Sequence, residues 1–321
     1  MNILITGGAG YIGSVVAELL EQQGHRLVVV DDLRDGQRAA VVPSAAFHRV
    51  DLCDLPALRA AFACQPLDAV IHLAASANVP DSVVNPLAYY ANNVQGTCNL
   101  LECMREHQVK RIIFSSTAAC YGDPQYLPMD EKHPLRPVNP YGQSKLMDEQ
   151  ILRDCMAAYG IRFVAFRYFC AAGATAAHGE SRKCETHLIP VVLDQALGKR
   201  DKVRVFGREF PTPDGTGVRD YIHVLDIARA HVLALARLDQ VAGEVFNLGT
   251  GAGYSVLEII AAAGRLLQTP VQFEFAPARP GDPPNLTAAC AKAQQQLGWT
   301  AQHGLDDIIR SAHAWRLAPA Y

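Results

Sequence analysis

The chain has 321 residues, of which 50% are hydrophobic and 19% charged, and its formal net charge is −3. This length and composition are typical of a globular protein with a large core, in one large domain or two closely packed ones. A near-neutral charge without basic blocks argues against nucleic-acid and membrane surfaces, and no apolar run approaches the roughly 18 residues that span a bilayer.

The nine cysteines are scattered, odd in number, and never form a Cys-x-x-Cys pair. A disulfide framework or a zinc site has a different pattern, so we expect reduced thiols in a cytoplasmic protein without a metal. Cys184 and His187 form an isolated C-x-x-H that lacks the second half of a metal site. The chain enters an apolar run at Asn2 without a basic or cleavage segment, so we expect no signal peptide.

Short apolar runs alternate with longer helical patterns in the first half of the chain. The predicted strands are 2–6, 26–31, 47–51, 69–74, 111–116 and 162–167, and the predicted helices are 12–23, 56–63, 86–107 and 140–159. Continuous apolar strands are typical of a parallel sheet that is covered by helices on both faces. The succession predicts an α/β fold with a Rossmann-type doubly wound parallel sheet, whose functional loops lie at the carboxyl ends of the strands.

The pattern changes after residue 170. Residues 171–186 are rich in Ala, Gly and polar residues, and 207–217 are rich in turn formers. A short strand "YIHV", an apolar helix over 226–238 and the segment "EVFNLGTG" follow. We predict that the large sheet domain comprises 1–170 and 222–247. A smaller α/β domain, made of 171–221 and 248–321, would cover the carboxyl edge of the sheet.

Residues 6–14, "TGGAGYIGS", follow the first predicted strand and open the first predicted helix. Gly7 would end the strand in a tight turn, Gly10 would let backbone approach a pyrophosphate, and Gly13 would let the helix pack closely on the strand. The helix N-terminus would then offer free N–H groups and a partial positive charge to phosphates. The spacing G-x-x-G-x-x-G therefore suggests a dinucleotide site.

An acidic residue at the end of the second strand tests this interpretation. Asp31 lies there, eighteen residues after Gly13. Its carboxylate accepts hydrogen bonds from both adenosine ribose hydroxyls and repels a 2′-phosphate, which favours NAD over NADP. Arg34 is the one nearby residue whose charge would soften this preference.

The segment "YGQSK" places Tyr141 and Lys145 four residues apart at the start of a helix, so both project from one face. A phenol normally titrates near pH 10, but an ammonium and the positive nicotinamide of bound NAD both favour the phenolate. Tyr141 would thus become a base at neutral pH. Thr117, which follows the strand "RIIFSS" at the carboxyl edge of the sheet, would bind the same substrate oxygen.

These segments together resemble the extended short-chain dehydrogenases/reductases, and within them the UDP-glucose (UDP-galactose) 4-epimerases. The resemblance extends over essentially the whole chain. It rests on "TGGAGYIGS", "HLAA", "YYANNVQGT", "FSSTAACYG", "NPYGQSK", "RYFCAAGA", "ETHLIP", "VFGREFPTPDGTGVRDYIHVLDIARAHV", "FNLGTGAGYSV" and "RPGDPP" in this order.

The resemblance implies a tightly held NAD that is reduced and reoxidised in each cycle. Tyr141 would take the proton of the sugar 4-hydroxyl while C4 gives a hydride to NAD, and the 4-keto sugar would turn over before it receives the hydride on its other face. Lys145 would hold the nicotinamide ribose, and Thr117 would assist at the 4-oxygen. The implied cofactor-binding residues are Gly7, Gly10, Tyr11, Ile12, Gly13, Asp31, Asp32, Asp51, Leu52, Leu73, Ala74, Ala75, Asn92, Ser115, Tyr141, Lys145 and Tyr168.

The resemblance also implies a UDP-sugar partner in the smaller domain. The implied substrate-binding residues are Thr117, Phe169, Cys170, His187, Leu188, Phe206, Arg219, Val256, Arg279, Asp282 and Leu286. Among them, the guanidinium groups of Arg219 and Arg279 suit a diphosphate. A homodimer is implied through the helices 86–107 and 140–159. The apolar residues Leu100, Leu101, Met104, Met147 and Ile151 of these helices exceed what one sheet face needs, although facing the sheet is an alternative explanation for them.

Three positions depart from the family pattern. Ala77 stands where some members carry a lysine, and Cys170 replaces the asparagine of the usual "RYFN". Leu286 stands where a tyrosine narrows the sugar pocket against N-acetylated substrates. Leucine is smaller, so UDP-N-acetylhexosamines are candidate substrates beside UDP-glucose and UDP-galactose, although an ordinary packing role for Leu286 explains it equally well.

Three other activities need comparison. Nucleotide-sugar dehydratases and decarboxylases place an acidic residue directly after the strand-end hydroxyl, where this chain has Ala118 and Ala119. A 4-epimerase for UDP-xylose/UDP-arabinose or UDP-glucuronate remains the main alternative. A non-catalytic NAD-binding sensor is a remote one, because Tyr141, Lys145 and the arginines are all present.

Overall fold

The large sheet of the protein is fully parallel. A computed structural model describes residues 1–182, 185–279 and 282–321. Its seven-stranded sheet has the order β10-β6-β5-β4-β1-β2-β3. The strands are β1 (Asn2–Thr6), β2 (Arg26–Asp31), β3 (Ala46–Arg49), β4 (Ala69–His72), β5 (Arg111–Thr117), β6 (Arg162–Tyr168) and β10 (Glu244–Leu248). The predicted fold class is confirmed, and the chain reverses direction across the sheet between β1 and β4, where such folds bind ligands.

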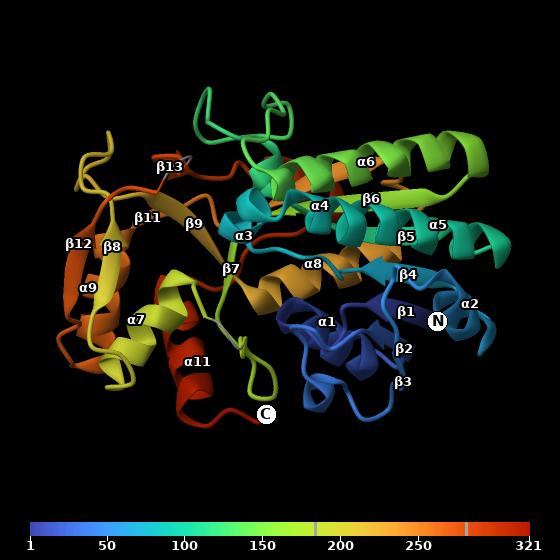
Figure 1. Cartoon of the computed structure of the whole chain (residues 1–321), viewed down its shortest axis with the longest axis horizontal. Coiled ribbons are helices and arrows are strands. Elements are labelled where there is room, and N and C mark those ends of the chain that lie inside the picture. The colour runs from blue at the N-terminus through green and yellow to red at the C-terminus, as the bar shows by residue number, and fades with distance from the viewer. Residues whose placement is uncertain (183–184, 280–281) are drawn as a thin grey trace.

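Helices cover both faces of this sheet (Figure 1). One apolar core joins the sheet to α1 (Tyr11–Gln22) and α8 (Val224–Arg237). The other joins it to α2 (Leu55–Ala63), α5 (Gly96–Glu106) and α6 (Pro140–Tyr159). The sheet is therefore buried on both faces, which explains its continuous apolar strands.

The local sequence explains both ends of α6, whose bounds match the prediction. The side chain of Asn139 accepts a hydrogen bond from the backbone N–H of Gly142, and Pro140 occupies the first turn, where its missing N–H costs nothing. Gly160 ends the helix in the left-handed conformation, with φ of 68°. Tyr141 and Lys145 thus lie in the first two turns of a well-capped helix.

The predicted helix over 86–107 is helical, but it is not a single α-helix. It comprises α4 (Pro86–Tyr89), a π-helical turn η2 (Tyr90–Gln95) and α5. A π-turn holds an additional residue and shifts the faces of the residues around it. Leu100, Leu101 and Met104 are buried in the core between the sheet and the helices α2, α5 and α6. This contradicts their prediction as surplus apolar residues at a dimer interface. Ile151 also packs against this core, whereas Met147 is exposed.

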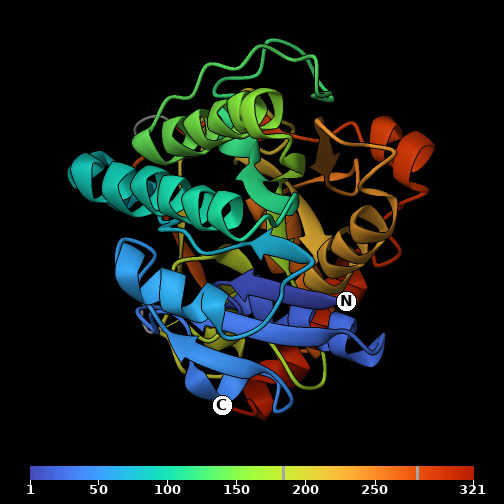
Figure 2. The ribbon, with the colours of Figure 1, turned by 90° about the vertical axis from the view of Figure 1, so that its right-hand side faces the viewer.

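Beyond the carboxyl edge of the large sheet, short strands and helices form the smaller part of the molecule (Figures 1 and 2). β9 (Val218–His223) pairs with β7 (Cys170–Ala172), β11 (Gly253–Ser255) and β13 (Asn285–Leu286), and β8 (Val203–Phe206) pairs with β12 (Phe273–Ala276). The helices α7 (Leu188–Ala196), α9 (Val256–Leu267) and α11 (Leu305–Leu317) share their apolar core.

The shorter elements complete the chain. They are η1 (Arg38–Ala40), α3 (Val79–Val84), η3 (Ala118–Cys120) and α10 (Ala291–Leu297). β10 joins the large sheet, as the predicted domain ranges require, but α10 also packs against β10 and α8. The predicted division into two domains therefore stays a prediction. Within the described residues, no helix has the length and apolar character needed to cross a membrane.

Candidate functional site

The glycine-rich turn between β1 and α1 has no room for side chains. Gly7 has φ of +72°, and a Cβ on it would lie 2.6 Å from the backbone nitrogen of Ala74. A Cβ on Gly13 would lie 2.1 Å from the carbonyl oxygen of Gly7. Only glycine at this position therefore lets the first turn of α1 pack against the backbone of the glycine-rich turn. Gly10 begins α1 without a capping side chain. The first N–H groups of the helix are therefore available to an anionic group, as a dinucleotide requires.

A cavity of about 530 Å³ opens beside this turn at the carboxyl edge of the sheet. All seventeen residues predicted to bind the cofactor line it. They come from the first five strands of the sheet or the segments directly after them, from β6, and from α1, η2 and α6. The volume and the donor set fit a dinucleotide that lies across the reversal point between β1 and β4.

Asp31 lies at the end of β2 and is nearly buried. Its carboxylate accepts hydrogen bonds from the backbone N–H groups of Ala9 (3.0 Å) and Leu33 (2.8 Å). Burial raises the pKa of Asp31, and these two hydrogen bonds oppose the rise. Arg34 pairs with Asp32 at 2.8 Å and donates to the side-chain oxygen of Asn92 at 3.2 Å. The guanidinium is thus matched by acidic groups, so this edge of the cavity keeps an acidic character that suits NAD.

Tyr141 and Lys145 point into the same cavity from the start of α6. The ammonium of Lys145 is buried and lies 4.5 Å from the ring centre of Phe114. Burial raises the pKa of Tyr141 to about 12, although the hydroxyl of Thr117 beside it has a lowering effect. The predicted lowering of this pKa is therefore wrong for the protein's own groups, because desolvation outweighs them.

Tyr168 closes the cavity on the side of β6. Its hydroxyl lies 2.7 Å from Nε2 of His231, whose Nδ1 lies 2.9 Å from the carbonyl oxygen of Ile227. The carbonyl requires the proton on Nδ1, so Nε2 accepts from Tyr168. Burial lowers the pKa of His231 to about 4, which keeps the ring neutral. Tyr168 is thus a fixed, protonated wall of the site.

The sequence reasoning missed several residues at or beside the cavity. Asn93, in η2, does not line the cavity but supports Ser76, which does. It bonds both backbone groups of Ser76 (2.8 and 3.1 Å) and the hydroxyl of Ser144 (2.9 Å), and so joins the loop after β4 to α6 beside Lys145. The other missed residues line the cavity and include Ser76, Asn78, Asp81, Tyr89, Glu180, Ser181, Arg182 and Tyr321. The segment "YYANNVQGT" carried the signal for Asn93, whereas nothing local in the sequence marks Tyr321.

Apart from Thr117 at the end of β5, the residues predicted to bind the substrate lie on the short strands beyond this cavity or next to them. Arg219 of β9 forms an ion pair with Asp282, and the guanidinium of Arg279 stacks 3.8 Å from the ring centre of Phe206. Val256 begins α9 directly after β11. Two cationic groups, Arg219 and Arg279, therefore lie beyond the large cavity, and each has an acidic or aromatic partner beside it.

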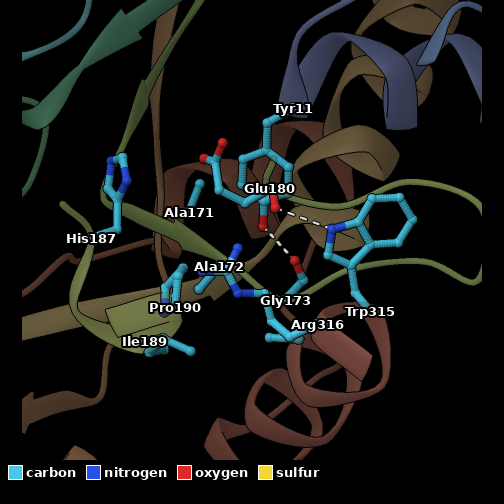
Figure 3. A pocket seen from close by; sticks show the side chains of 11 residues that line it. Tyr11, Ala171, Ala172, Gly173, Glu180, His187, Ile189, Pro190, Trp315 and Arg316 are labelled. Carbon is cyan, nitrogen blue, oxygen red and sulfur yellow. Dashed lines mark hydrogen bonds between the residues drawn. The ribbon is translucent and has the colours of Figure 1, made fainter. Parts of the chain in front are cut away.

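His187 and Leu188 lie further along, at the start of α7. Figure 3 shows a small pocket between His187 and α11, which Tyr11 and Glu180 also line, whereas Leu188 does not line it. Tyr11 donates a hydrogen bond of 2.6 Å to the carbonyl oxygen of Gly173, which joins α1 to the segment after β7. Both Tyr11 and Glu180 also line the large cavity, so the two spaces adjoin.

One group of described residues has the spacing of metal ligands. Glu180, Glu185 and His187 bring ligand atoms within 4.8 Å of one another, and Nδ1 of His187 lies 2.7 Å from the carboxylate of Glu185. Arg182 lies 3.4 Å from the carboxylate of Glu180. Cys184, the other half of the C-x-x-H pattern, lies outside the described residues. The expectation that the protein holds no metal stays a prediction.

The three unusual positions lie near the two binding regions. Ala77 lines the large cavity after β4. Cys170 begins β7, and burial raises the pKa of its thiol to about 11, so it remains protonated and uncharged. Leu286, in β13, packs against an apolar cluster that contains Ala118 and Phe169. Leu286 is therefore close to the strand end that carries Thr117.

Comparisons with known proteins agree with this site. The family model described as "NAD dependent epimerase/dehydratase family" matches residues 3–249. The UDP-glucose 4-epimerase of Streptococcus mutans is 48% identical over 321 residues, covering 98% of this chain and 96% of its relative. The crystal structure of UDP-glucose 4-epimerase from Brucella ovis in complex with NAD has a TM-score of 0.93 and 46% identity, covering 97% of both chains.

A second solved structure has both types of ligand. The UDP-glucose 4-epimerase from Bifidobacterium longum, in complex with NAD+ and UDP, has a TM-score of 0.95 and 39% identity and covers 99% of both chains. Full-length similarity of this kind, together with the glycine-rich turn, Asp31 and the Tyr141–Lys145 pair in one cavity, leads to a plain conclusion. The chain belongs to the NAD dependent epimerase/dehydratase family and, within it, to the UDP-glucose 4-epimerases.

Proposed function

We propose that Tyr141, Lys145 and Thr117 perform the chemistry of UDP-hexose 4-epimerisation in this chain. The activity itself is that of an NAD-dependent isomerase acting on UDP-glucose and UDP-galactose. The observation that supports the assignment of residues is their placement. Tyr141 and Lys145 share a cavity with the glycine-rich turn, and Thr117 lies beside Tyr141.

When bound, NAD supplies the acceptor and donor of the hydride at C4 of the sugar, together with a positive ring charge beside Tyr141. The phenolate oxygen of Tyr141 would take the proton of the 4-hydroxyl, and it would return a proton to the 4-oxygen after the sugar has turned and C4 has received the hydride on its other face. Thr117 hydrogen bonds to the same sugar oxygen and holds it in line. Burial raises the pKa of Tyr141, so the positive charges of Lys145 and of the nicotinamide ring would together have to offset this rise to favour the phenolate.

Arg219 and Arg279 hold the diphosphate of the UDP-sugar in this proposal. The guanidinium groups bind it bidentately, and the 4-keto sugar turns about the diphosphate while the nucleotide stays in place. Phe206, already stacked on Arg279, contributes an apolar surface next to it. Phe169, Cys170, His187, Leu188, Val256, Asp282 and Leu286 are proposed to complete the substrate site.

Replacement of Tyr141 by Phe tests the proposed base directly. The substitution removes only the hydroxyl, so we expect turnover of UDP-galactose to fall by about 10²–10⁴-fold, as for the loss of a general base, while NAD remains bound. The measurement is product formation without added NAD, with cofactor content determined after denaturation. Normal activity in Tyr141→Phe would exclude the proposed mechanism.

The range of sugars requires a separate experiment. The purified protein would be incubated with UDP-galactose, UDP-N-acetylgalactosamine, UDP-xylose and UDP-glucuronate in separate reactions. Conversion of UDP-galactose alone indicates a hexose-specific enzyme, and conversion of the N-acetylated sugar as well indicates a wider pocket at Leu286. Conversion of only the pentose or the uronate would favour the alternative substrate, and binding of NAD without any turnover would favour a sensor.

A homodimer in the cytoplasm completes the proposal. Val83, Val84 and Leu87 are 61%, 77% and 82% exposed, and Met147 is 38% exposed. They lie on α3, α4 and α6, which pack against one another. This apolar surface supports association through the same side of the molecule that the sequence predicted. The eight described cysteines are free thiols, which supports a reducing compartment.

A further inference from the structure

Asp148 is a buried carboxyl on the catalytic helix that the proposed mechanism does not use. It lies in α6, three residues after Lys145, and it is 0% exposed. Neither of its oxygens has a hydrogen-bond partner among the described residues. An ionised carboxylate in such a place is costly unless a nearby charge compensates for it. Burial accordingly raises the pKa of Asp148.

The groups that face Asp148 leave one cation available to it. In α5, the hydroxyl of Thr97 faces Asp148 and has a lowering effect on its pKa, but its proton is donated to the carbonyl oxygen of Asn93 at 2.7 Å, and the thiol of Cys98 is uncharged. In α6, the neighbouring Glu149 is negative and is bonded by Arg167 at 2.7 Å. The remaining facing group is Lys145, whose charge interacts with that of Asp148 without a direct hydrogen bond.

Lys145 needs such a counter-charge. It is 1% exposed, and the ring of Phe114 is its close contact. Burial lowers its pKa, and Asp148 is the largest influence in the opposite direction. His72 is neutral and does not compensate the ammonium. Burial lowers its pKa well below the usual value, and its Nε2 and Nδ1 lie 2.9 and 2.7 Å from the hydroxyls of Thr97 and Thr6. Without Asp148, the ammonium would lose its nearest compensating charge.

We propose that Asp148, three residues after Lys145 on the same buried face of α6, is a positioning residue that keeps Lys145 protonated through its charge rather than through a direct bond. This inference rests on the proposed role of Lys145. The cationic form of Lys145 favours the Tyr141 phenolate, and the neutral amine does not. Activity should therefore fall as pH rises through the pKa of Lys145, and Asp148 determines where that fall occurs.

The test is the pH dependence of kcat for UDP-galactose in the full-length, NAD-loaded Asp148→Asn variant. Asparagine has nearly the same size but no charge, so the pKa of Lys145 falls. We expect the alkaline limb of the profile to move to lower pH by about one unit or more, the usual effect of losing a nearby opposite charge. Asp148→Glu should restore the original limb, and KM should change little in both variants.

A matched substitution on the same helix provides the control. Asp154 is exposed and accepts a hydrogen bond from Gln150 at 2.9 Å, so Asp154→Asn should leave the profile unchanged. If Asp148→Asn folds poorly, Asp148→Leu is the second neutral variant. It introduces no buried amide and should give the same shift of the alkaline limb. An alkaline limb that stays in place in both neutral variants would overturn the inference.

The Lys145→Met variant separates this inference from the proposed function. Strong loss of turnover in Lys145→Met, with an unmoved profile in Asp148→Asn, would refute the role of Asp148 alone. Normal turnover in Lys145→Met would refute the proposed role of Lys145 itself, and the inference about Asp148 with it.

Discussion

Leu286 is the residue at which substrate choice is most directly testable. It packs against the apolar cluster that contains Ala118 and Phe169. If the sugar binds beside this cluster, as proposed, a larger side chain at position 286 takes up part of its space. We therefore expect Leu286→Tyr to lower kcat/KM for UDP-N-acetylgalactosamine, relative to UDP-galactose, by about tenfold or more, which corresponds to 1–3 kcal/mol of steric discrimination. Leu286→Met is the size-matched control, and an unchanged ratio in Leu286→Tyr would show that this side chain only packs.

Single residues also show what sequence can and cannot predict about a site. Gly7, Asp31 and Tyr141 were predicted because the chemistry of a dinucleotide site requires these residue types at fixed spacings, and they do share one cavity. The sequence reasoning did not foresee that burial raises the pKa of Tyr141, because desolvation depends on the whole surrounding structure, and the lowering by bound NAD stays a prediction. Tyr321 was missed because only tertiary folding brings the end of the chain to this cavity.

At the level of elements, α6 is attached to two strands of the sheet through one buried carboxylate. Glu149 accepts hydrogen bonds from Ser116 of β5 at 2.6 Å and from Arg167 of β6 at 2.7 and 2.9 Å. The Arg167 guanidinium also donates to the hydroxyl of Tyr121 at 3.1 Å. These bonds fix the helix that carries Tyr141 relative to the strand that carries Thr117.

Loss of this carboxylate should destabilise the fold. Glu149→Gln leaves the buried charge of Arg167 uncompensated, so we expect the free energy of unfolding to fall by about 3–5 kcal/mol. Urea denaturation followed by circular dichroism measures the change. Glu102→Gln, which removes an exposed partner of Arg105, is the control and should have little effect. A similar small effect in both variants would mean that the buried pair contributes little.

Long elements with start and stop signals in their own sequence were predicted well. Short strands that pair with distant parts of the chain were not. The long helix α6 has its cap, its first-turn proline and its terminal glycine in its own sequence, so its bounds were predicted. The strands β7, β11 and β13 have two or three residues, and β9 joins them from distant parts of the chain, so no local pattern reveals them. The π-turn η2 was missed because a continuous helical pattern does not show one additional residue in a turn.

For the whole molecule, the proposed dimer makes a specific prediction. Val84 and Leu87 are largely exposed on α3 and α4, and a charge at these positions would remain unpaired in an apolar interface. We expect the double substitution Val84→Glu and Leu87→Glu to convert a dimer into a monomer in sedimentation velocity measurements. Leu317→Glu, at another exposed apolar residue on α11, should leave the dimer intact. A monomeric wild-type protein would refute the proposed assembly.

The position of β10 at the edge of the large sheet has a consequence for protein synthesis. The chain completes six strands by residue 168, then forms β7, β8 and β9 elsewhere, and returns to the sheet only with Glu244–Leu248. Until a ribosome has released that segment, the outer edge of β6 has unpaired backbone groups, and an edge of this kind is prone to pair with other chains. The edge of β6 therefore stays exposed while roughly a quarter of the chain is synthesised. Factors that bind nascent chains should act during that period.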